Sequence, residues 1–256
     1  MFSWAPKGMI ALMSREVART FRVPVQTLVG PWISAALYIL VFGAVVGSQL
    51  SHISGVPYIN FVIPGILMMS VLNAAFMAAA HGLYFQRFTK MIEEILVAPL
   101  SYTDMIFAFV LAAVVRGLVV AVGIYGMAIL LGAAVIVHPV LFLVGIVGVS
   151  MLFAFLGLIV GLWSEGFEQL SVLQTFIIQP LTYLGGIFYA RSMLPEWAQI
   201  FTTFNPFFQL VDTVRYTMVG VREGSALAGW GTMWGLTFFF GLVAWTLFQR
   251  GYKLRS

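Results

Sequence analysis

Long apolar segments alternate with short charged ones along this chain, and this alternation limits its fold more than any other feature. Six segments are apolar over a length sufficient to cross the hydrocarbon core of a bilayer as an α-helix, which takes about 20 residues. They are residues 31–47, 58–80, 104–131, 139–163, 170–189 and 227–248. Charged residues make up 9% of the chain, whereas soluble domains carry about 25%. The pattern excludes a soluble globular domain and a disordered chain, and it predicts a polytopic membrane protein.

The segments between the spans are too short to hold a soluble domain of ordinary size. We therefore expect residues 1–256 to form one all-α membrane domain with six transmembrane helices. The chain has no cysteine, which excludes disulfides, thiolate nucleophiles and cysteine-ligated metal centres. The net charge of +4 bears on orientation in the membrane rather than on nucleic-acid binding, and no nucleic-acid partner is expected.

The distribution of Lys and Arg predicts the orientation of the chain. With a cytoplasmic N-terminus, nine of the thirteen Lys and Arg residues lie in inner segments. The short outer segments 48–57 and 132–138 carry no charged residue at all. The positive-inside rule therefore places both termini in the cytoplasm, and we expect a multi-pass protein of the bacterial inner membrane.

Residues 1–30 contain an amphipathic helix that Pro24 should end. Its predicted apolar stripe consists of Ile10, Met13, Val17 and Phe21, and its cationic face of Arg15, Arg19 and Arg22. Such a helix lies in the membrane interface, with its arginines toward anionic lipid headgroups. Two interpretations stay open: simple anchoring to lipid, or a lever that also contacts a cytoplasmic partner.

The loop of residues 81–103 holds a second amphipathic helix, which Pro99 ends. Its apolar stripe consists of Phe88, Ile92, Ile95 and Leu96, and its charged side of Arg87, Lys90, Glu93 and Glu94. Because the charge is mixed, docking into a groove on another protein is more natural than binding to lipid alone. The alternative is a solvated loop helix.

The outer segment of residues 190–226 is too apolar for a free loop. Asn205-Pro206 indicates a turn between two short helices that dip into or lie on the outer leaflet. Trp197 and Tyr216 would then lie at headgroup depth.

Two parts of the sequence resemble a known family. The first is Pro180-Leu-Thr-Tyr-Leu-Gly-Gly-Ile-Phe-Tyr189, followed by Leu194-Pro195, Asn205-Pro206 and Arg215-Tyr216. The second is Ile92-Glu-Glu-Ile-Leu-Val-Ala-Pro-Leu-Ser101. Both resemble the ABC-2 type permeases, which are the membrane subunits of type V ABC exporters. Within that family the chain looks most like the short bacterial permeases of the YadH and nodulation-factor-export branch, whose ATPase is a separate polypeptide.

The resemblance implies a transporter of two permease chains and two ATPase chains. It implies that residues 81–103 carry a coupling helix, and that residues 190–226 form an outer re-entrant hairpin. The chain lacks the G-x-x-x-x-G-K-[ST] phosphate loop, so no cofactor is expected in it, and ATP and Mg²⁺ would bind to the partner. The residues that the resemblance assigns to ATPase contact are Arg15, Arg19, Arg87, Phe88, Lys90, Ile92, Glu93, Glu94, Glu165 and Glu168.

Arg116 lies deep in the third predicted span, where a charge costs about 2.5–3.5 kcal/mol on insertion scales. It either contacts an anionic substrate headgroup or pairs structurally with a carbonyl or carboxylate of another helix. Residues assigned to the substrate pathway or its gate are Arg116, Tyr183, Phe188, Trp197 and Arg215, and Asn73, Gln174, Gln179 and Thr182 are further candidates.

These features favour an exporter of an amphipathic substrate, such as a lipid, glycolipid or hydrophobic drug, because few polar groups are available to desolvate a soluble ion. A proton-coupled transporter is the alternative, but it needs titratable groups within the spans, and arginine does not titrate usefully. An intramembrane enzyme is disfavoured because His52 and His138 lie on the side opposite His81 and cannot share a metal. No catalytic residues are assigned.

Overall fold

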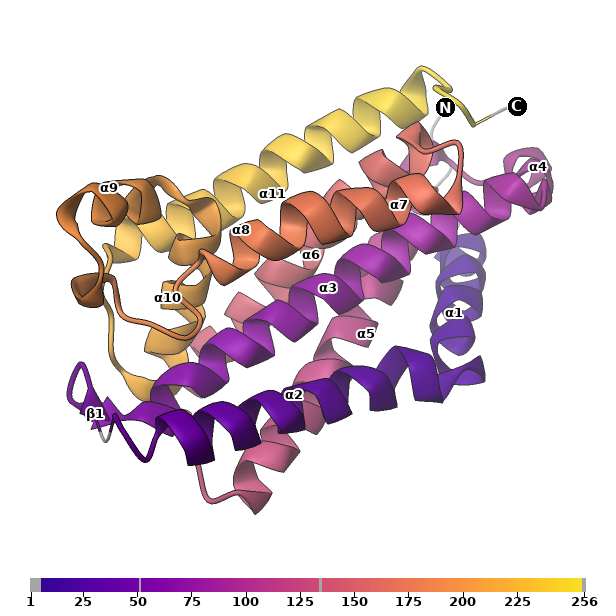
Figure 1. The fold of residues 1–256 in the computed structure, drawn as a ribbon. Coiled ribbons are helices and arrows are strands. Elements are labelled where there is room, and N and C mark those ends of the chain that lie inside the picture. Colours follow the sequence, from indigo (N-terminus) through magenta and orange to yellow (C-terminus); the bar gives the residue numbers. More distant parts are fainter. Residues whose placement is uncertain (1–5, 51, 134, 255–256) are drawn as a thin grey trace.

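The computed structural model describes residues 6–50, 52–133 and 135–254, and its architecture is helical (Figure 1). Five helices in the described ranges are long and apolar enough to cross a membrane. They are Val25–Gly43, Tyr58–Phe88, Tyr102–Leu130, Pro139–Trp163 and Ala226–Gln249. The prediction of a polytopic helical membrane protein is confirmed. A small antiparallel pair, β1 (His52–Ile53) and β2 (Val56–Pro57), was not predicted; its turn places Ser54 and Gly55 at positive φ.

Three long helices form the centre of the bundle: α3 (Tyr58–Phe88), α5 (Tyr102–Leu130) and α6 (Pro139–Trp163). Ser101 starts α5 with a capping box, in which its hydroxyl accepts from the Asp104 N–H and the Asp104 carboxylate accepts from the Ser101 N–H. α6 packs closely on α3 because two glycines of α6 face α3. A Cβ at Gly157 would lie 2.6 Å from the Phe76 carbonyl oxygen, and one at Gly161 would lie 2.8 Å from that of Ala80.

Two apolar helices flank this centre. The first crossing is one helical run of η1 (Val25–Val29), α2 (Gly30–Leu40) and η2 (Val41–Val46), in which the η segments are π-helical. It begins before the predicted residue 31. The last crossing is α11 (Ala226–Gln249). Both leave large apolar side chains uncovered, for example Leu37 and Phe238. Such faces are suited to lipid or to a second membrane chain.

The fifth predicted span differs from its predicted form. The helical run consists of α7 (Phe167–Leu173), the π-helical η3 (Gln174–Ile178) and α8 (Gln179–Tyr183), and it ends six residues before residue 189. Its length of about 25 Å falls short of a hydrocarbon core of about 30 Å. The chain then turns, with Gly186 at a φ of +71°. The π-helical η3 ends two residues before Pro180, which has no N–H for the helical ladder.

The outer segment forms two α-helices, as predicted. A short 3₁₀ turn, η4 (Arg191–Met193), leads into α9 (Glu196–Phe204), and Asn205 then caps α10 (Pro206–Val219) by accepting from the Phe207 N–H at 2.9 Å. α9 lies on the surface with Phe204 83% exposed. α10 is almost wholly buried against α3, α6 and α11.

The N-terminal helix α1 (Pro6–Arg22) ends two residues before Pro24, as predicted, but buries a different face. Ile10 and Phe21 of the predicted stripe are about half exposed, at 52% and 50%. The buried positions are Leu12, Glu16 and Thr20, spaced four residues apart. The predicted stripe was assigned to the membrane interface, and that assignment stays a prediction. Within the chain α1 packs on α5, and the acidic Glu16 is among its buried residues.

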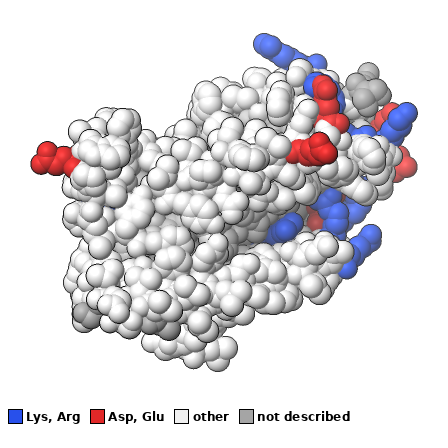
Figure 2. Space-filling model, in the orientation of Figure 1, with Lys and Arg blue, Asp and Glu red and all other residues white. Residues whose placement is uncertain are grey.

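Charged residues gather at one end of the bundle (Figure 2). This charged end consists of α1, α4 (Met91–Val97), the loop of residues 164–166 and residues 250–254. The opposite end, here called the hairpin end, carries β1, β2, α9 and α10 (Figure 1). The start of α1 and the end of α11 both lie at the charged end, which requires an even number of crossings between them.

Candidate functional site

A polar cavity of about 860 Å³ lies between α2 and the run of α7, η3 and α8, with α3 and α5 behind it and α1 at the charged end. Figure 2 shows the surface hollowed between these elements, with basic atoms inside the hollow near the charged end. Its walls carry an unusual share of hydroxyl, amide and basic groups for the interior of an apolar bundle. Ligand pockets typically have volumes of about 300–1,000 Å³.

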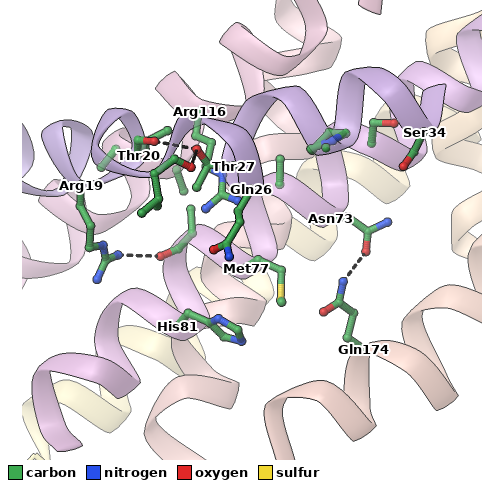
Figure 3. A pocket seen from close by; sticks show the side chains of 18 of the residues that line it. Arg19, Thr20, Gln26, Thr27, Ser34, Asn73, Met77, His81, Arg116 and Gln174 are labelled. Carbon is green, nitrogen blue, oxygen red and sulfur yellow. Dashed lines mark hydrogen bonds between the residues drawn. The ribbon is translucent and has the colours of Figure 1, made fainter. Parts of the chain in front are cut away.

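Amide and hydroxyl groups bridge the cavity. The Gln174 side-chain amide donates to the Asn73 Oδ1 at 3.0 Å, joining η3 to α3 (Figure 3). Gln179 and Tyr183, which were assigned to the substrate pathway, also line the cavity. Thr182 does not: it is buried and donates to the Ile178 carbonyl oxygen of its own helix.

Aromatic side chains join α2 to α8 at the hairpin end of the cavity. The Tyr38 and Tyr183 hydroxyls lie 3.1 Å apart. Beside them Phe188 stacks on Phe42, with ring centroids 4.0 Å apart. These four residues, here called the aromatic cluster, hold the two helices together between the cavity and the hairpin end.

An ion pair lies at the charged end of the cavity. The Arg19 guanidinium is 2.6 Å from the Glu16 carboxylate, which also accepts from the Gln86 amide. Arg19 further donates to the Gly82 and Ala78 carbonyl oxygens at 3.3 Å each. A Cβ at Gly82 would lie 2.3 Å from the Arg19 Nη2, so a larger residue there would displace the end of the Arg19 side chain. Burial raises the pKa of Glu16, against the opposing effects of Arg19, Arg15 and Gln86, and burial also lowers the pKa of Arg19.

Arg116 lines the same cavity from the middle of α5. Among the described residues, no carboxylate or carbonyl hydrogen bonds to it, and its buried Nε has no partner. The structural pairing that we weighed for Arg116 is therefore not found in the described part of the chain. Arg19, His81 and Arg116 come from three different helices and face the same space (Figure 3).

The five residues assigned to the pathway lie in four places. Arg116 and Tyr183 line the cavity, and Phe188 belongs to the aromatic cluster. Trp197 lies on α9 and is 68% exposed. Arg215 lies on α10 away from the cavity lining. Sequence reasoning missed Arg19 and His81 as cavity residues, because nothing in their spacing shows that α1 and α3 meet there.

Arg215 is completely buried and bonded within the chain. Its Nε donates to the Phe61 carbonyl oxygen at 3.2 Å, and its Nη2 donates to that of Gly186. The guanidinium also lies 3.8 Å from the centroid of the Phe61 ring. Arg215 thus joins α10 to α3 and to the turn after α8.

The predicted amphipathic helix of residues 87–96 is in fact two pieces. α3 continues to Phe88, Lys90 adopts the left-handed conformation with φ of 59°, and α4 begins at Met91. The prediction of a single continuous helix is therefore wrong. Phe88 is 64% exposed, whereas Ile92 is 3% exposed and packs within this chain. Glu93 and Glu94 are exposed in the first turn of α4, where carboxylates favour the helix dipole.

Arg87 contacts backbone carbonyl groups at the charged end. Its Nη1 donates to the carbonyl oxygens of Gly161, Leu162 and Ser164, at 2.7, 2.8 and 3.1 Å. These groups belong to the last turn of α6, where helix carbonyls lack intrahelical partners. Arg87 is therefore committed to contacts within this chain.

The loop before α7 forms the rest of this end. Glu165 pairs with Lys253 at 2.6 Å, which lowers the pKa of its carboxyl, and Glu168 is exposed. Phe167 packs edge-on against Tyr84 and Phe88. Arg15 is half-buried beside Glu16.

Exposed apolar and acidic side chains therefore lie together at the charged end. The exposed apolar ones are Phe85, Phe88, Met91, Val97, Trp163 and Phe167, and the exposed acids are Glu93, Glu94, Glu165 and Glu168. We call this set the end surface. Apolar side chains rimmed by charge are typical of a protein-binding surface.

A bundle of apolar helices around a polar cavity, with a binding surface at one end, defines a multi-spanning membrane transport protein. The ABC-2 type transporter family model matches residues 8–219. The chain is 33% identical to the inner membrane transport permease YadH of Escherichia coli (strain K12), over 96% of each chain. It is 24% identical to nodulation protein J of Rhizobium meliloti (strain 1021), over 82% of this chain and 81% of that one. The chain therefore belongs to the ABC-2 type transporter family. It is a permease subunit, not an ATPase, and this class works with an ABC ATPase.

Proposed function

We propose that this chain is the membrane half of an exporter that moves an amphipathic substrate outward across the bacterial inner membrane. Two copies of the chain and two ATPase chains make up the transporter, and the ATPases bind ATP and Mg²⁺. The observation that carries the proposal is the position of the cavity. It lies directly behind the end surface and is separated from the hairpin end by the aromatic cluster.

In this proposal the charged end faces the cytoplasm, and the chain crosses the membrane six times. The run of α7, η3 and α8 is the fifth of these crossings, and the turn at Gly186 and the α9–α10 hairpin complete its path at the outer leaflet. The absence of native cysteine makes this orientation easy to test. In intact cells from which the outer membrane barrier has been removed, an impermeant maleimide should label Ser225→Cys but not Thr89→Cys.

Coupling to the ATPase is assigned to the end surface. α4 rests on Ile92 and Ile95, which face inward, so its exposed Glu93 and Glu94 are held in place for a partner. Phe88 and Phe167 offer the apolar contact, with Lys90, Glu165 and Glu168 around them. Arg15 and Arg19 would transmit movement of α1 to the cavity, since Arg19 bonds to α3.

The second copy is assigned to the exposed apolar faces of α2 and of the run from α7 to α8. Each face has exposed apolar side chains: Leu37 and Leu40 on α2, and Phe176 and Ile177 on η3. Pairing of two chains across these faces would enclose two cavities away from lipid.

The deciding experiment is co-purification of the tagged permease with a phosphate-loop ATPase from its own host cells. The double variant Glu93→Lys/Glu94→Lys should reduce recovery of the ATPase about tenfold or more, since it reverses two charges at the contact. Glu196→Lys, an exposed charge reversal on α9, is the matched control and should leave recovery unchanged. Full transport by the permease without any ATPase would overturn the proposal. Transport that resists ATP depletion but stops with an uncoupler would instead support proton coupling.

A further inference from the structure

We propose that the charged-end half of the cavity binds the phosphate headgroup of an anionic amphipathic molecule, with Arg116 as its main ligand and His81 and Arg19 beside it. This deepens the proposed function by naming the substrate class, and it rests on that function for the direction of movement. The binding itself follows from the charge and hydrogen bonding of the cavity.

The cavity has an excess of basic groups. Its Arg, His, Asp and Glu residues are Arg19, His81, Arg116 and Glu16, and it is lined by no Lys. Glu16 is already engaged, with Arg19 at 2.6 Å and with the Gln86 amide. The ion pair therefore neutralises Arg19 and leaves the charge of Arg116 without a counter-ion in the described part of the chain.

Hydrogen bonding leads to the same conclusion. The Arg116 Nε and the His81 Nε2 are both buried, and neither has a partner among the described residues. Buried polar groups in proteins almost always have partners, and a ligand or bound water in the cavity would supply one for both of these donors. A guanidinium in an apolar bundle is costly, and a phosphate oxygen pair fits its fork of N–H donors better than any neutral group.

The remainder of the cavity suits the rest of an amphipathic molecule. Met69, Met77, Phe85 and Phe109 provide apolar wall area beside the polar groups. A volume of about 860 Å³ exceeds what a single phosphate group fills, so the site has room for a headgroup and the adjoining part of its chains. Because Arg19 of α1 lines the cavity near its charged end, the headgroup would bind at the depth of the inner leaflet. Figure 3 shows Arg19, His81 and Arg116 around this space.

The test uses the full-length permease purified in a neutral detergent and phosphate-free buffer. Calorimetric titration compares dioctanoyl phosphatidic acid with dioctanoylglycerol, which has the same chains and no phosphate. Wild type should bind the phosphatidic acid about tenfold tighter or better, the value of one charge-assisted hydrogen bond. Arg116→Gln should abolish this preference. Equal binding of the two lipids by wild type, or an unchanged preference in Arg116→Gln, would overturn the proposal.

Arg222→Gln is the matched control. Arg222 also has a buried nitrogen without a partner in the described chain, but it lies over the Tyr216 ring, away from the cavity lining. Arg222→Gln should keep the full preference for phosphatidic acid. Loss of that preference in Arg222→Gln would overturn the assignment of phosphate binding to Arg116. Competition by inorganic phosphate distinguishes a site for a lipid headgroup from a site for the free phosphate ion. Weak competition by phosphate supports a site for a lipid headgroup. If phosphate binds as tightly as the lipid, the proposal of a lipid headgroup is overturned and the site binds a free anion.

Because this titration needs no ATPase, its failure is distinguishable from failure of the proposed function. In the co-purified complex, phosphatidic acid in phosphatidylcholine nanodiscs should stimulate ATP hydrolysis by wild type but not by Arg116→Gln, while recovery of the ATPase stays the same. Equal stimulation of both would overturn the role of Arg116, whatever the partner capture shows.

Discussion

The Arg87 Nε donates to the Lys253 carbonyl oxygen at 2.7 Å, which joins the end of α3 to the segment after α11. The same guanidinium bonds to the last turn of α6. Lys253 in turn donates from its ammonium group to the Trp163 carbonyl oxygen and pairs with Glu165. The helix ends that carry the end surface are thus held together by backbone contacts of two basic side chains.

Arg87→Gln should destabilise the protein by about 3 kcal/mol, because several carbonyl groups lose a charged donor at once. The midpoint of thermal unfolding in detergent measures this. Arg87→Lys should recover only a part, since an ammonium group cannot reproduce the guanidinium geometry. Arg250→Gln, at an exposed basic residue nearby, is the control and should leave the midpoint unchanged. Equal midpoints for Arg87→Gln and wild type would contradict this account.

Gly157→Ala should destabilise the protein by about 1–3 kcal/mol through overpacking. The new Cβ would meet the Phe76 carbonyl oxygen and the Ala80 N–H group, which are backbone atoms that cannot rotate away. Gly126→Ala in α5 is the control, because open space surrounds that position. It should be neutral or stabilising by up to about 1 kcal/mol. Thermal unfolding again gives the comparison, and the same effect at both positions would argue against close packing of α6 on α3.

Glu16 should make stability depend on pH. Its folded-state pKa is raised above the ordinary 4.5 by burial, so the folded protein holds this proton more tightly than the unfolded chain does. The contribution of Glu16 is therefore greatest below about pH 4.5 and is lost as pH rises through the folded-state pKa. Relative to Glu16→Gln, which cannot titrate, wild type should lose stability over that range and then level off. A relative gain with rising pH would show that Arg19 outweighs burial.

Phe188→Ala should open the cavity toward the hairpin end, because it removes the stacking on Phe42 that reinforces the Tyr38–Tyr183 contact. In a chain without native cysteine, Asn73→Cys reports on the cavity. An impermeant maleimide added from the hairpin side should label Asn73→Cys several-fold faster when Phe188→Ala is also present. Trp197→Ala, on the exposed α9, should not change the rate. Labelling that is equally fast without Phe188→Ala would mean that the aromatic cluster does not close the cavity.

The sequence predicted the large-scale organisation well, since each of its strongest signals is local. Spans are recognised by their length and hydropathy, and the α9–α10 turn is recognised by Asn205-Pro206. The start of α5 at its Ser101 cap was not predicted. The predictions that failed concern helix breaks and side-chain burial, which depend on contacts between residues far apart in the sequence. Phe88 and Ile92 share a helical spacing, yet Lys90 breaks the helix between them, and packing against α3 covers Ile92 alone.

The candidate site shows the same division. Arg116 was identified from the sequence, because a charge within an apolar span is conspicuous without any neighbour. That it shares a cavity with Arg19 and His81 was not predictable, because the three residues lie on α5, α1 and α3. Arg215 shows the opposite case: its position beside an outer helix suggested a gate, and the fold encloses it completely.

The sequence by itself thus determined that the chain is a membrane protein, how many apolar segments it has, and which family its motifs resemble. Each of these three conclusions depends only on the residues within single segments. The tertiary structure decided which polar groups meet and which remain without a partner. Helix packing brought Glu16 of α1 to Gln86 of α3 and left Arg116 facing the cavity without a carboxylate in the described chain. Such pairing depends on the rotation and close approach of helices, which glycines such as Gly157 and Gly161 permit, and no local pattern of residues encodes it.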